Sequence, residues 1–168
     1  LLSKVLDDIL ADVPKEKIDE RVSLFKRNMH NLSYEVMANP IGVKGIGKYI
    51  SRDSETSFAK YKKGAPVHVK AAINYNSLID HWYEGKRYEK ISNGTKIRWV
   101  YLKENSFGFD AIAFKGHEDP REILELIKNH IDHNKMYEQA MSKKLGMFYK
   151  AMHWGGVEDK TTSMNRFF

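Results

Sequence analysis

Few residues in this 168-residue chain have the types and spacing of a catalytic centre. The sequence contains neither a Gly-x-Ser-x-Gly turn, which would hold a nucleophilic serine, nor a Gly-Lys-Ser/Thr phosphate loop. Asp7 and Asp8 are adjacent, but neighbours on a helix point about 100° apart, which is more typical of a solvated face than of a metal site. His130 and His133 could share a helix face, although no carboxylate pattern accompanies them. We therefore expect no catalytic residue and no metal ligand.

Side chains suited to binding are concentrated between residues 44 and 70. This segment contains seven basic and two acidic residues, so its net charge is +5 in a chain whose net charge is +6. Tyr49, Tyr61 and His68 lie among them as hydrogen-bonding groups, and nearby glycines would let backbone N–H groups approach a phosphate. This mixture favours a phosphate-binding surface over the alternative, a solvated basic face. The basic residues are Lys44, Lys48, Arg52, Lys60, Lys62, Lys63 and Lys70.

The composition is typical of a folded protein with a polyanionic partner. Hydrophobic residues make up 42% of the chain, enough for one core, and 28 Lys and Arg outnumber 22 Asp and Glu. No cysteine is present, so we expect an intracellular setting without disulfides. No apolar run approaches the ~20 residues of a membrane span, so no membrane partner is expected. Because the chain starts in helical periodicity without Met, we interpret it as part of a longer protein.

Apolar spacing predicts the first elements. Two helices should open the chain, separated at Pro14. Residues 32–38, "LSYEVMA", alternate like a short strand, and residues 39–49, with one proline and three glycines, read as a structured loop. The apolar stripe of the opening helices consists of Val5, Ile9, Val13, Ile18, Val22, Phe25 and Met29.

The later elements alternate between helices and one hairpin. A helix over 66–83 should start at Pro66, and "TKIRWVYL" with "FDAIAF" should pair as a β-hairpin. Asp119 should cap a helix that begins at Pro120. A longer helix over 134–152 should follow, ended by the glycines at 155 and 156. The expected inward residues of the last two helices are Ile123, Ile127, Ile131, Tyr137, Met141, Leu145, Phe148 and Met152.

Four sequence blocks in one order carry a family resemblance. They are "FKRNMHNLSYEVMANPIGVKGIGKY", "KKGAPVHVKAAINYNSLI", "GTKIRWVYLKENSFGFDAIAF", and a helix pair followed by a terminal aromatic peptide. Together they resemble the C-terminal thumb region of a B-family replicative DNA polymerase of the T-even-like bacteriophage type, over roughly residues 21–168. No single block is decisive, but their order and spacing are specific together.

In that family the exonuclease, palm and fingers precede the thumb, and palm aspartates bind the Mg²⁺ used for nucleotidyl transfer. None of those motifs occurs in this sequence. The resemblance therefore implies no catalytic residue and no cofactor here, with Mg²⁺ expected in a palm domain outside this chain. "GKRYEK" is similar to a palm motif of the family. It follows the helix predicted over 66–83, where the palm motif cannot be, so the palm role is not transferred to Lys86, Arg87 or Tyr88.

The family's thumb wraps the primer–template duplex DNA and holds its backbone. Position by position, Lys48 and Tyr49 of "GIGKY" match the family's backbone-contacting residues, as do His68 and Lys70 of "PVHVK". Cations with hydroxyl and imidazole donors suit phosphate positioning, and none of them reads a base. Further DNA-binding candidates are Lys44 and Gly45, which match more loosely, and Lys60, Lys62 and Lys63, which rest on charge alone.

The chain ends with "KTTSMNRFF". Met164, Phe167 and Phe168 have the hydrophobic-x-x-aromatic-aromatic spacing of the peptide with which replication proteins bind the sliding clamp. Thr161 stands where that peptide usually has glutamine. The alternative is a tail that docks on its own core; the polar linker after the glycine pair favours the clamp.

The sequence thus predicts an α+β fold: a mainly helical thumb domain over 1–156 with a small antiparallel β element, and a flexible clamp-binding tail over 157–168. The expected function is that of a DNA-polymerase thumb in DNA replication, in the cytoplasm of a bacterial host. The first alternative is a free-standing basic nucleic-acid-binding protein without catalytic activity. A nuclease-type enzyme is a further alternative that would require clustered carboxylates.

Overall fold

The computed structural model describes residues 1–51, 61–84 and 86–157. The chain folds as two compact units. The terminal unit comprises Leu1–Leu32 and His133–Phe168, and the central unit comprises Ser33–Asp132. The candidate residues Lys60, Met164, Phe167 and Phe168 lie outside the described residues.

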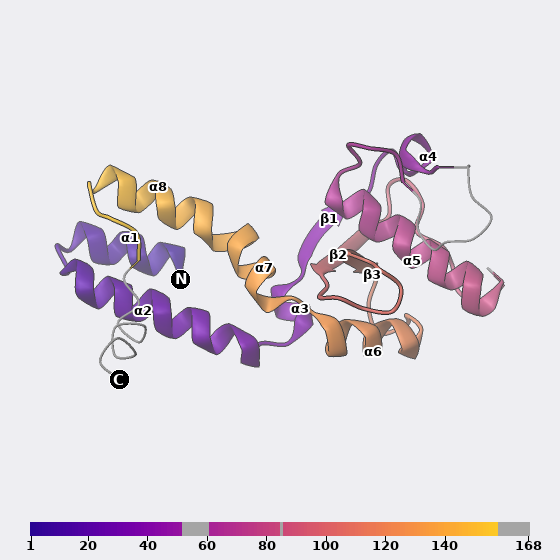
Figure 1. Cartoon of the computed structure of the whole chain (residues 1–168), viewed down its shortest axis with the longest axis horizontal. Helices are drawn as coiled ribbons and strands as arrows, with labels where there is room; N and C mark the ends of the chain where they lie inside the picture. The colour runs from indigo at the N-terminus through magenta and orange to yellow at the C-terminus, as the bar shows by residue number, and fades with distance from the viewer. Residues whose placement is uncertain (52–60, 85, 158–168) are drawn as a thin grey trace. The chain divides into compact units, whose positions relative to one another are not determined.

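The terminal unit is built from helices at both ends of the chain (Figure 1). Helices α1 (Leu2–Leu10) and α2 (Lys15–Asn28) confirm the two predicted opening helices, and Pro14 directly precedes α2. The short 3₁₀ helix η1 (Met29–Asn31) follows α2. Helices α7 (His133–Tyr137) and α8 (Lys143–Ala151) return from the other end of the chain, and α8 packs against α1.

Two buried carboxylates in the terminal unit are neutralised by specific partners. Asp8 pairs with Lys4 and Arg21. Asp19 accepts from the Lys15 ammonium at 2.6 Å and from the Tyr149 hydroxyl at 2.5 Å. Because a buried charge without partners is costly, these contacts account for the acidic residues inside an otherwise apolar helix interface.

A π-helical segment, η2 (Glu138–Ser142), interrupts the single helix predicted over 134–152. Tyr137 and Leu145 are both buried, although eight residues of regular α-helix would place them about 80° apart. The extra residue accommodated by a π-turn reduces this angle to about 20°, so both side chains reach one face. The interruption also buries Tyr149, which the sequence-based stripe did not include, while Met152 is exposed.

The central unit contains a three-stranded antiparallel sheet in the order β1-β2-β3. Strand β1 (Asn39–Gly42) pairs with β2 (Lys96–Tyr101), and β2 pairs with β3 (Ala111–Phe114), which confirms the predicted hairpin. With the helices described here, this small sheet confirms the α+β class.

Helices α5 (Val67–Tyr83) and α6 (Arg121–His130) pack on the sheet and confirm the predicted helices in those regions. Figure 1 shows α5 running across the sheet, and a buried hydrogen bond of 2.7 Å joins the Asn74 side-chain amide to the Ala111 backbone oxygen of β3. Ile123, Ile127 and Ile131 are buried, as their spacing predicted.

Three local predictions were wrong. Residues 32–38 form no strand, because the short helix α3 (Tyr34–Met37) places the Tyr34 ring 5.3 Å from that of Phe114. Residues 39–49 contain β1 and the short helix α4 (Ile46–Tyr49) rather than only a loop. Asp119 does not cap α6; its buried carboxylate accepts from the backbone N–H groups of Lys115 and Gly116 and from the Tyr75 hydroxyl.

Candidate nucleic-acid interface

The segment that carries Lys44 and Lys48 is anchored to the loop before β2. Beyond β1, the Val43 backbone exchanges hydrogen bonds with Thr95 and Gly94 at 3.1 Å and 2.8 Å. The backbone N–H of Ile46, at the start of α4, donates to the Asn93 side-chain oxygen at 3.1 Å. Val43 and Ile46 are buried, so their burial holds Lys44 and Lys48, which are exposed, at the surface.

Gly45 makes the turn into α4. Its φ of +81° lies in the left-handed region, which residues with a side chain adopt only at a cost. A Cβ at this position would meet the Tyr49 ring at 3.7 Å, an ordinary contact distance, so the cost of a side chain comes from the backbone angle. Gly45 is therefore required by the backbone turn that sets the direction of α4.

The second candidate segment lies beside the first. Ile50 and Tyr61 form an isolated antiparallel bridge, and the Lys62 backbone N–H donates to the Tyr49 backbone oxygen at 2.7 Å. Helix α4 also contacts α5. The two sequence blocks that hold the DNA-binding candidates, "GIGKY" and "KKGAPVHVK", thus form one surface, which we call the basic surface. Its candidate residues are Lys44, Gly45, Lys48, Tyr49, Lys62, Lys63, His68 and Lys70.

The lysines of the basic surface have no acidic partner in the part of the chain that the structure describes. Lys48 and Lys70 instead lie over aromatic rings, at 5.1 Å from the centre of Tyr49 and 5.0 Å from that of Tyr61. Elsewhere in the central unit, Lys86, Lys90 and Arg121 form ion pairs with carboxylates. Lys48 and Lys70, held over phenol rings, therefore place ammonium donors beside hydroxyl groups, an arrangement suited to an external anion.

Tyr61 contributes a proton donor to the basic surface. Burial raises the pKa of its phenol, and the Asp110 carboxylate adds to the increase. A tyrosine hydroxyl is already protonated at neutral pH, and this shift extends its role as a donor to higher pH.

Helix α5 supplies His68 and Lys70 from its first turn. Pro66 occupies the N-cap position with extended backbone angles. The first N–H groups of a helix lack intrahelical acceptors, and the helix dipole gives this end a partial positive charge. This end of α5 therefore adds to the positive potential of the neighbouring lysines.

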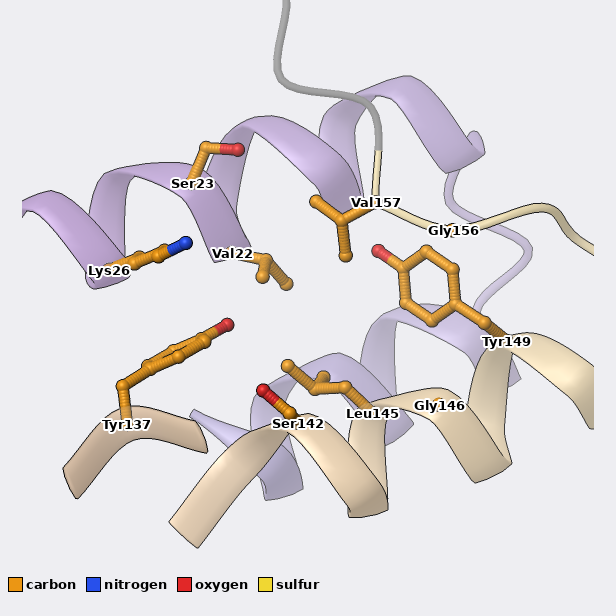
Figure 2. A pocket seen from close by; sticks show the side chains of 10 residues that line it. All are labelled: Val22, Ser23, Lys26, Tyr137, Ser142, Leu145, Gly146, Tyr149, Gly156 and Val157. Atoms are coloured by element: carbon orange, nitrogen blue, oxygen red, sulfur yellow. The ribbon is translucent and has the colours of Figure 1, made fainter. Parts of the chain in front are cut away.

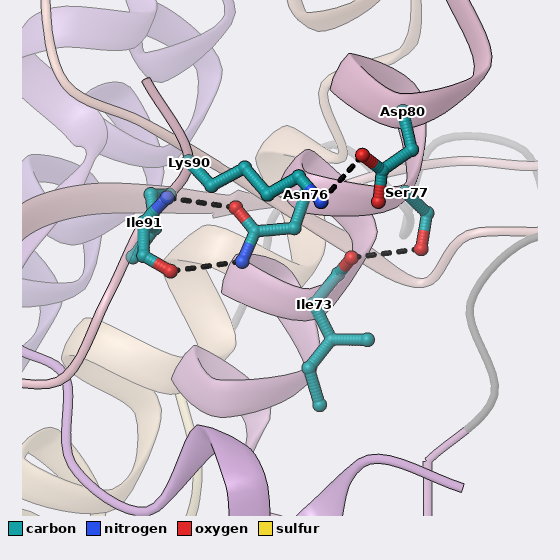
Figure 3. Close-up of polar contacts among 6 residues, drawn as sticks. All are labelled: Ile73, Asn76, Ser77, Asp80, Lys90 and Ile91. Carbon is teal, nitrogen blue, oxygen red and sulfur yellow. Dashed lines mark hydrogen bonds and ion pairs between the residues drawn. The ribbon is translucent and has the colours of Figure 1, made fainter. Parts of the chain in front are cut away.

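Helix α5 is hydrogen-bonded to the loop before β2, which also binds the start of α4. Figure 3 shows the Asn76 side-chain amide donating to the Ile91 backbone oxygen at 2.8 Å and accepting from the Ile91 N–H at 2.7 Å. Beside it, Lys90 pairs with Asp80 at 2.5 Å. Because Asn93, two residues after Ile91, binds α4, one loop fixes the positions of both helices that form the basic surface.

Sequence reasoning missed the two asparagines that organise the basic surface. Asn76 stands on a helix, where the side-chain amide can compete with backbone pairing, and Asn93 precedes a glycine in a turn-forming pair. These are signals of local structure only. The partners lie 15 and 47 residues away along the chain, so the contacts depend on the tertiary fold.

The remaining chemical candidates are separated or already paired. Asp7 is exposed whereas Asp8 is buried beside cations. His130 is the last residue of α6, and its Nδ1 lies 3.2 Å from the Glu104 backbone oxygen, while His133 begins a different helix. Within the described ranges, no group of three or more His, Cys, Asp or Glu side chains could hold a metal ion.

None of the helices in the described ranges has the length and apolar character needed to span a membrane. Comparison with known proteins adds no family assignment: no protein-family model matches the chain, and no curated protein sequence is significantly similar to it.

Proposed function

We propose that this chain is the thumb region of a DNA-directed DNA polymerase, which grips the primer–template duplex through its phosphate backbone and attaches to a sliding clamp. The observation that carries the proposal is the joining of "GIGKY" and "KKGAPVHVK" through the Ile50–Tyr61 bridge and the bond from Lys62 to Tyr49. The residues that the resemblance assigns to DNA contact come from separate blocks, and they lie on one surface.

The chemistry of the basic surface suits phosphate groups better than bases. Lysine ammonium groups act as point charges with rotatable donors, which neutralise phosphates without requiring a particular base. Base edges are read mainly by arginine, asparagine and glutamine, which make two hydrogen bonds to one base, and by lysine where it contacts guanine. The candidate set contains no arginine, asparagine or glutamine, so we expect binding to depend mainly on charge and little on DNA sequence.

The clamp contact belongs to Met164, Phe167 and Phe168, outside the described residues. Burial of such side chains is worth on the order of 1.5–3 kcal/mol each before ordering costs. An isolated peptide would bind with an affinity of about micromolar. In a complete polymerase that is sufficient, because clamp and polymerase share one DNA and the second contact is effectively intramolecular.

The proposal is tested by fluorescence anisotropy with two labelled primer–template duplexes of equal length and unrelated sequence. We expect this chain to bind both with the same affinity within about twofold, since phosphate contacts carry no sequence information. Single-stranded DNA of the same length serves as the comparison and should bind more weakly. A strong preference for one duplex sequence, or no binding at low salt, would contradict the proposal.

A further inference from the structure

The terminal unit contains a pocket of about 330 Å³ that shares no residue with the basic surface. Helix α2 forms one wall, the α7–η2–α8 segment forms the opposite wall, and Gly156 and Val157 border it from the chain after α8. A volume of this size is typical of small-molecule sites.

One side of the pocket is polar. Figure 2 shows the Lys26 amine and the hydroxyls of Tyr137 and Ser142 directed into the same part of the pocket. The Lys26 nitrogen lies 5.7 Å from the centre of the Tyr137 ring, which places the cation beside the phenol.

These three groups have no hydrogen-bonding or ionic partner among the described residues. The Tyr137 ring is largely buried, whereas its hydroxyl faces the pocket and makes no bond to the described residues, in contrast to the Tyr149 hydroxyl, which donates to Asp19. A hydroxyl on a fixed, largely buried ring that opens into a pocket is a positioned donor and acceptor for a molecule in that pocket. The η2 turn is what brings Tyr137 and Ser142 to this face, and π-helical turns often accompany functional sites.

The rest of the pocket is apolar. Val22 and Leu145 are buried and form its floor, and Val157 covers one edge (Figure 2). A cation and two hydroxyl donors on one side of an apolar floor fit an anionic group attached to a hydrophobic body. A neutral apolar molecule would gain nothing from Lys26 and the two hydroxyls, and a small ion without an apolar body would gain nothing from Val22 and Leu145.

We propose that this pocket binds a small amphipathic carboxylate: one carboxylate held by Lys26, Tyr137 and Ser142, and an aromatic or short aliphatic body on Val22 and Leu145. This site is independent of the DNA-binding proposal and involves no residue of the basic surface.

The test uses the full chain and 3-phenylpropionate as the probe, followed by methyl-resolved NMR. We expect saturable shifts of the Val22, Leu145 and Val157 methyl signals, with a dissociation constant in the millimolar range for so small a ligand. The uncharged 3-phenylpropan-1-ol should bind about tenfold more weakly, because it lacks the charge-assisted contact to Lys26.

Variants separate the polar contacts from the fold. Lys26→Met should weaken 3-phenylpropionate about tenfold and leave the alcohol unchanged, and Tyr137→Phe, which keeps the ring, should cause a smaller loss. Lys17→Met is the matched control, since Lys17 is exposed on the same helix but does not line the pocket. The proposal is wrong if the pocket methyls do not respond, or if Lys26→Met and Lys17→Met affect carboxylate binding equally.

Discussion

The Asn76 side-chain amide and the Ile91 backbone exchange two hydrogen bonds, at 2.8 Å and 2.7 Å, between α5 and the loop before β2. The same loop binds the start of α4 through Asn93. One residue therefore connects the helix that carries His68 and Lys70 to the loop that positions Lys48.

Asn76→Ala should destabilise the protein and weaken DNA binding together. Ile91 is 2% exposed, so the substitution leaves its backbone N–H and C=O without a partner, at a cost of about 1–3 kcal/mol. Urea denaturation measures the loss, and anisotropy measures the affinity. Asn129→Ala, at an exposed position on α6, is the control and should change neither quantity. Unchanged stability in Asn76→Ala would show that this contact does not hold the loop.

Gly45→Ala tests the turn into α4. The left-handed φ of Gly45 should make the substitution destabilising by about 1–2 kcal/mol, because a Cβ is strained in this region. Gly47→Ala is the matched control two residues later: no atom lies within 4 Å of its added Cβ, and alanine favours a helix. In chemical denaturation, the free energy of unfolding should be lower than that of the wild type for Gly45→Ala and higher for Gly47→Ala. Equal effects would contradict the assigned role of Gly45.

Alkaline pH should destabilise the central unit through its buried tyrosines. Burial, together with the Glu35 carboxylate, raises the pKa of Tyr34 to about 12, whereas an unfolded tyrosine has a pKa of about 10. The folded state therefore retains the phenol proton to higher pH than the unfolded state. The resulting contribution to the free energy of unfolding is complete below about pH 10 and is lost as pH rises toward 12. Thermal melts between pH 8 and 12 should show a melting temperature that declines from about pH 10. This decline should be smaller in Tyr34→Phe. A decline of the same size in Tyr34→Phe would assign the effect to other groups.

How much the sequence predicts depends on how many residues carry a pattern. The isoleucines at 123, 127 and 131 repeat a helical spacing over nine positions, and all are buried. The alternation of residues 32–38 covers only two turns of helix: Tyr34 and Ala38, four apart, are buried, while Val36 is 70% exposed. A segment this short fits both the two-residue period of a strand and the 3.6-residue period of a helix. Packing of Tyr34 against Phe114 favours the helix.

The candidate site, too, could be predicted only in part from the sequence. The excess of lysine between residues 44 and 70 is visible in the sequence, as are the glycines near Lys48. The bridge from Ile50 to Tyr61 and the side-chain bonds of Asn93 are not visible, because they join residues whose proximity exists only after folding. The π-helical η2 is likewise set by burial of Tyr137 and Tyr149, and not by a local signal.

The terminal aromatics should act as a detachable anchor for the clamp. Replacing Phe167 and Phe168 together by alanine should abolish binding to the cognate sliding clamp, since both rings would fill its apolar pocket. Duplex affinity and melting temperature should stay at wild-type values. Surface plasmon resonance on immobilised clamp measures the loss, and a melting temperature lowered by several degrees would instead assign the rings to the protein's own core.

The most direct test of the account is the salt dependence of duplex DNA binding by the wild type and by the double variant Lys48→Ala, Lys70→Ala. Each phosphate contact releases counterions, so we predict that the double variant binds all duplex sequences more weakly and that its log–log salt slope falls by about two. The control pair Lys103→Ala, Lys128→Ala removes the same charge from exposed positions outside the basic surface and should keep the wild-type slope. If the Lys48, Lys70 variant binds as tightly as the wild type at low salt with an unchanged slope, the basic surface does not hold DNA.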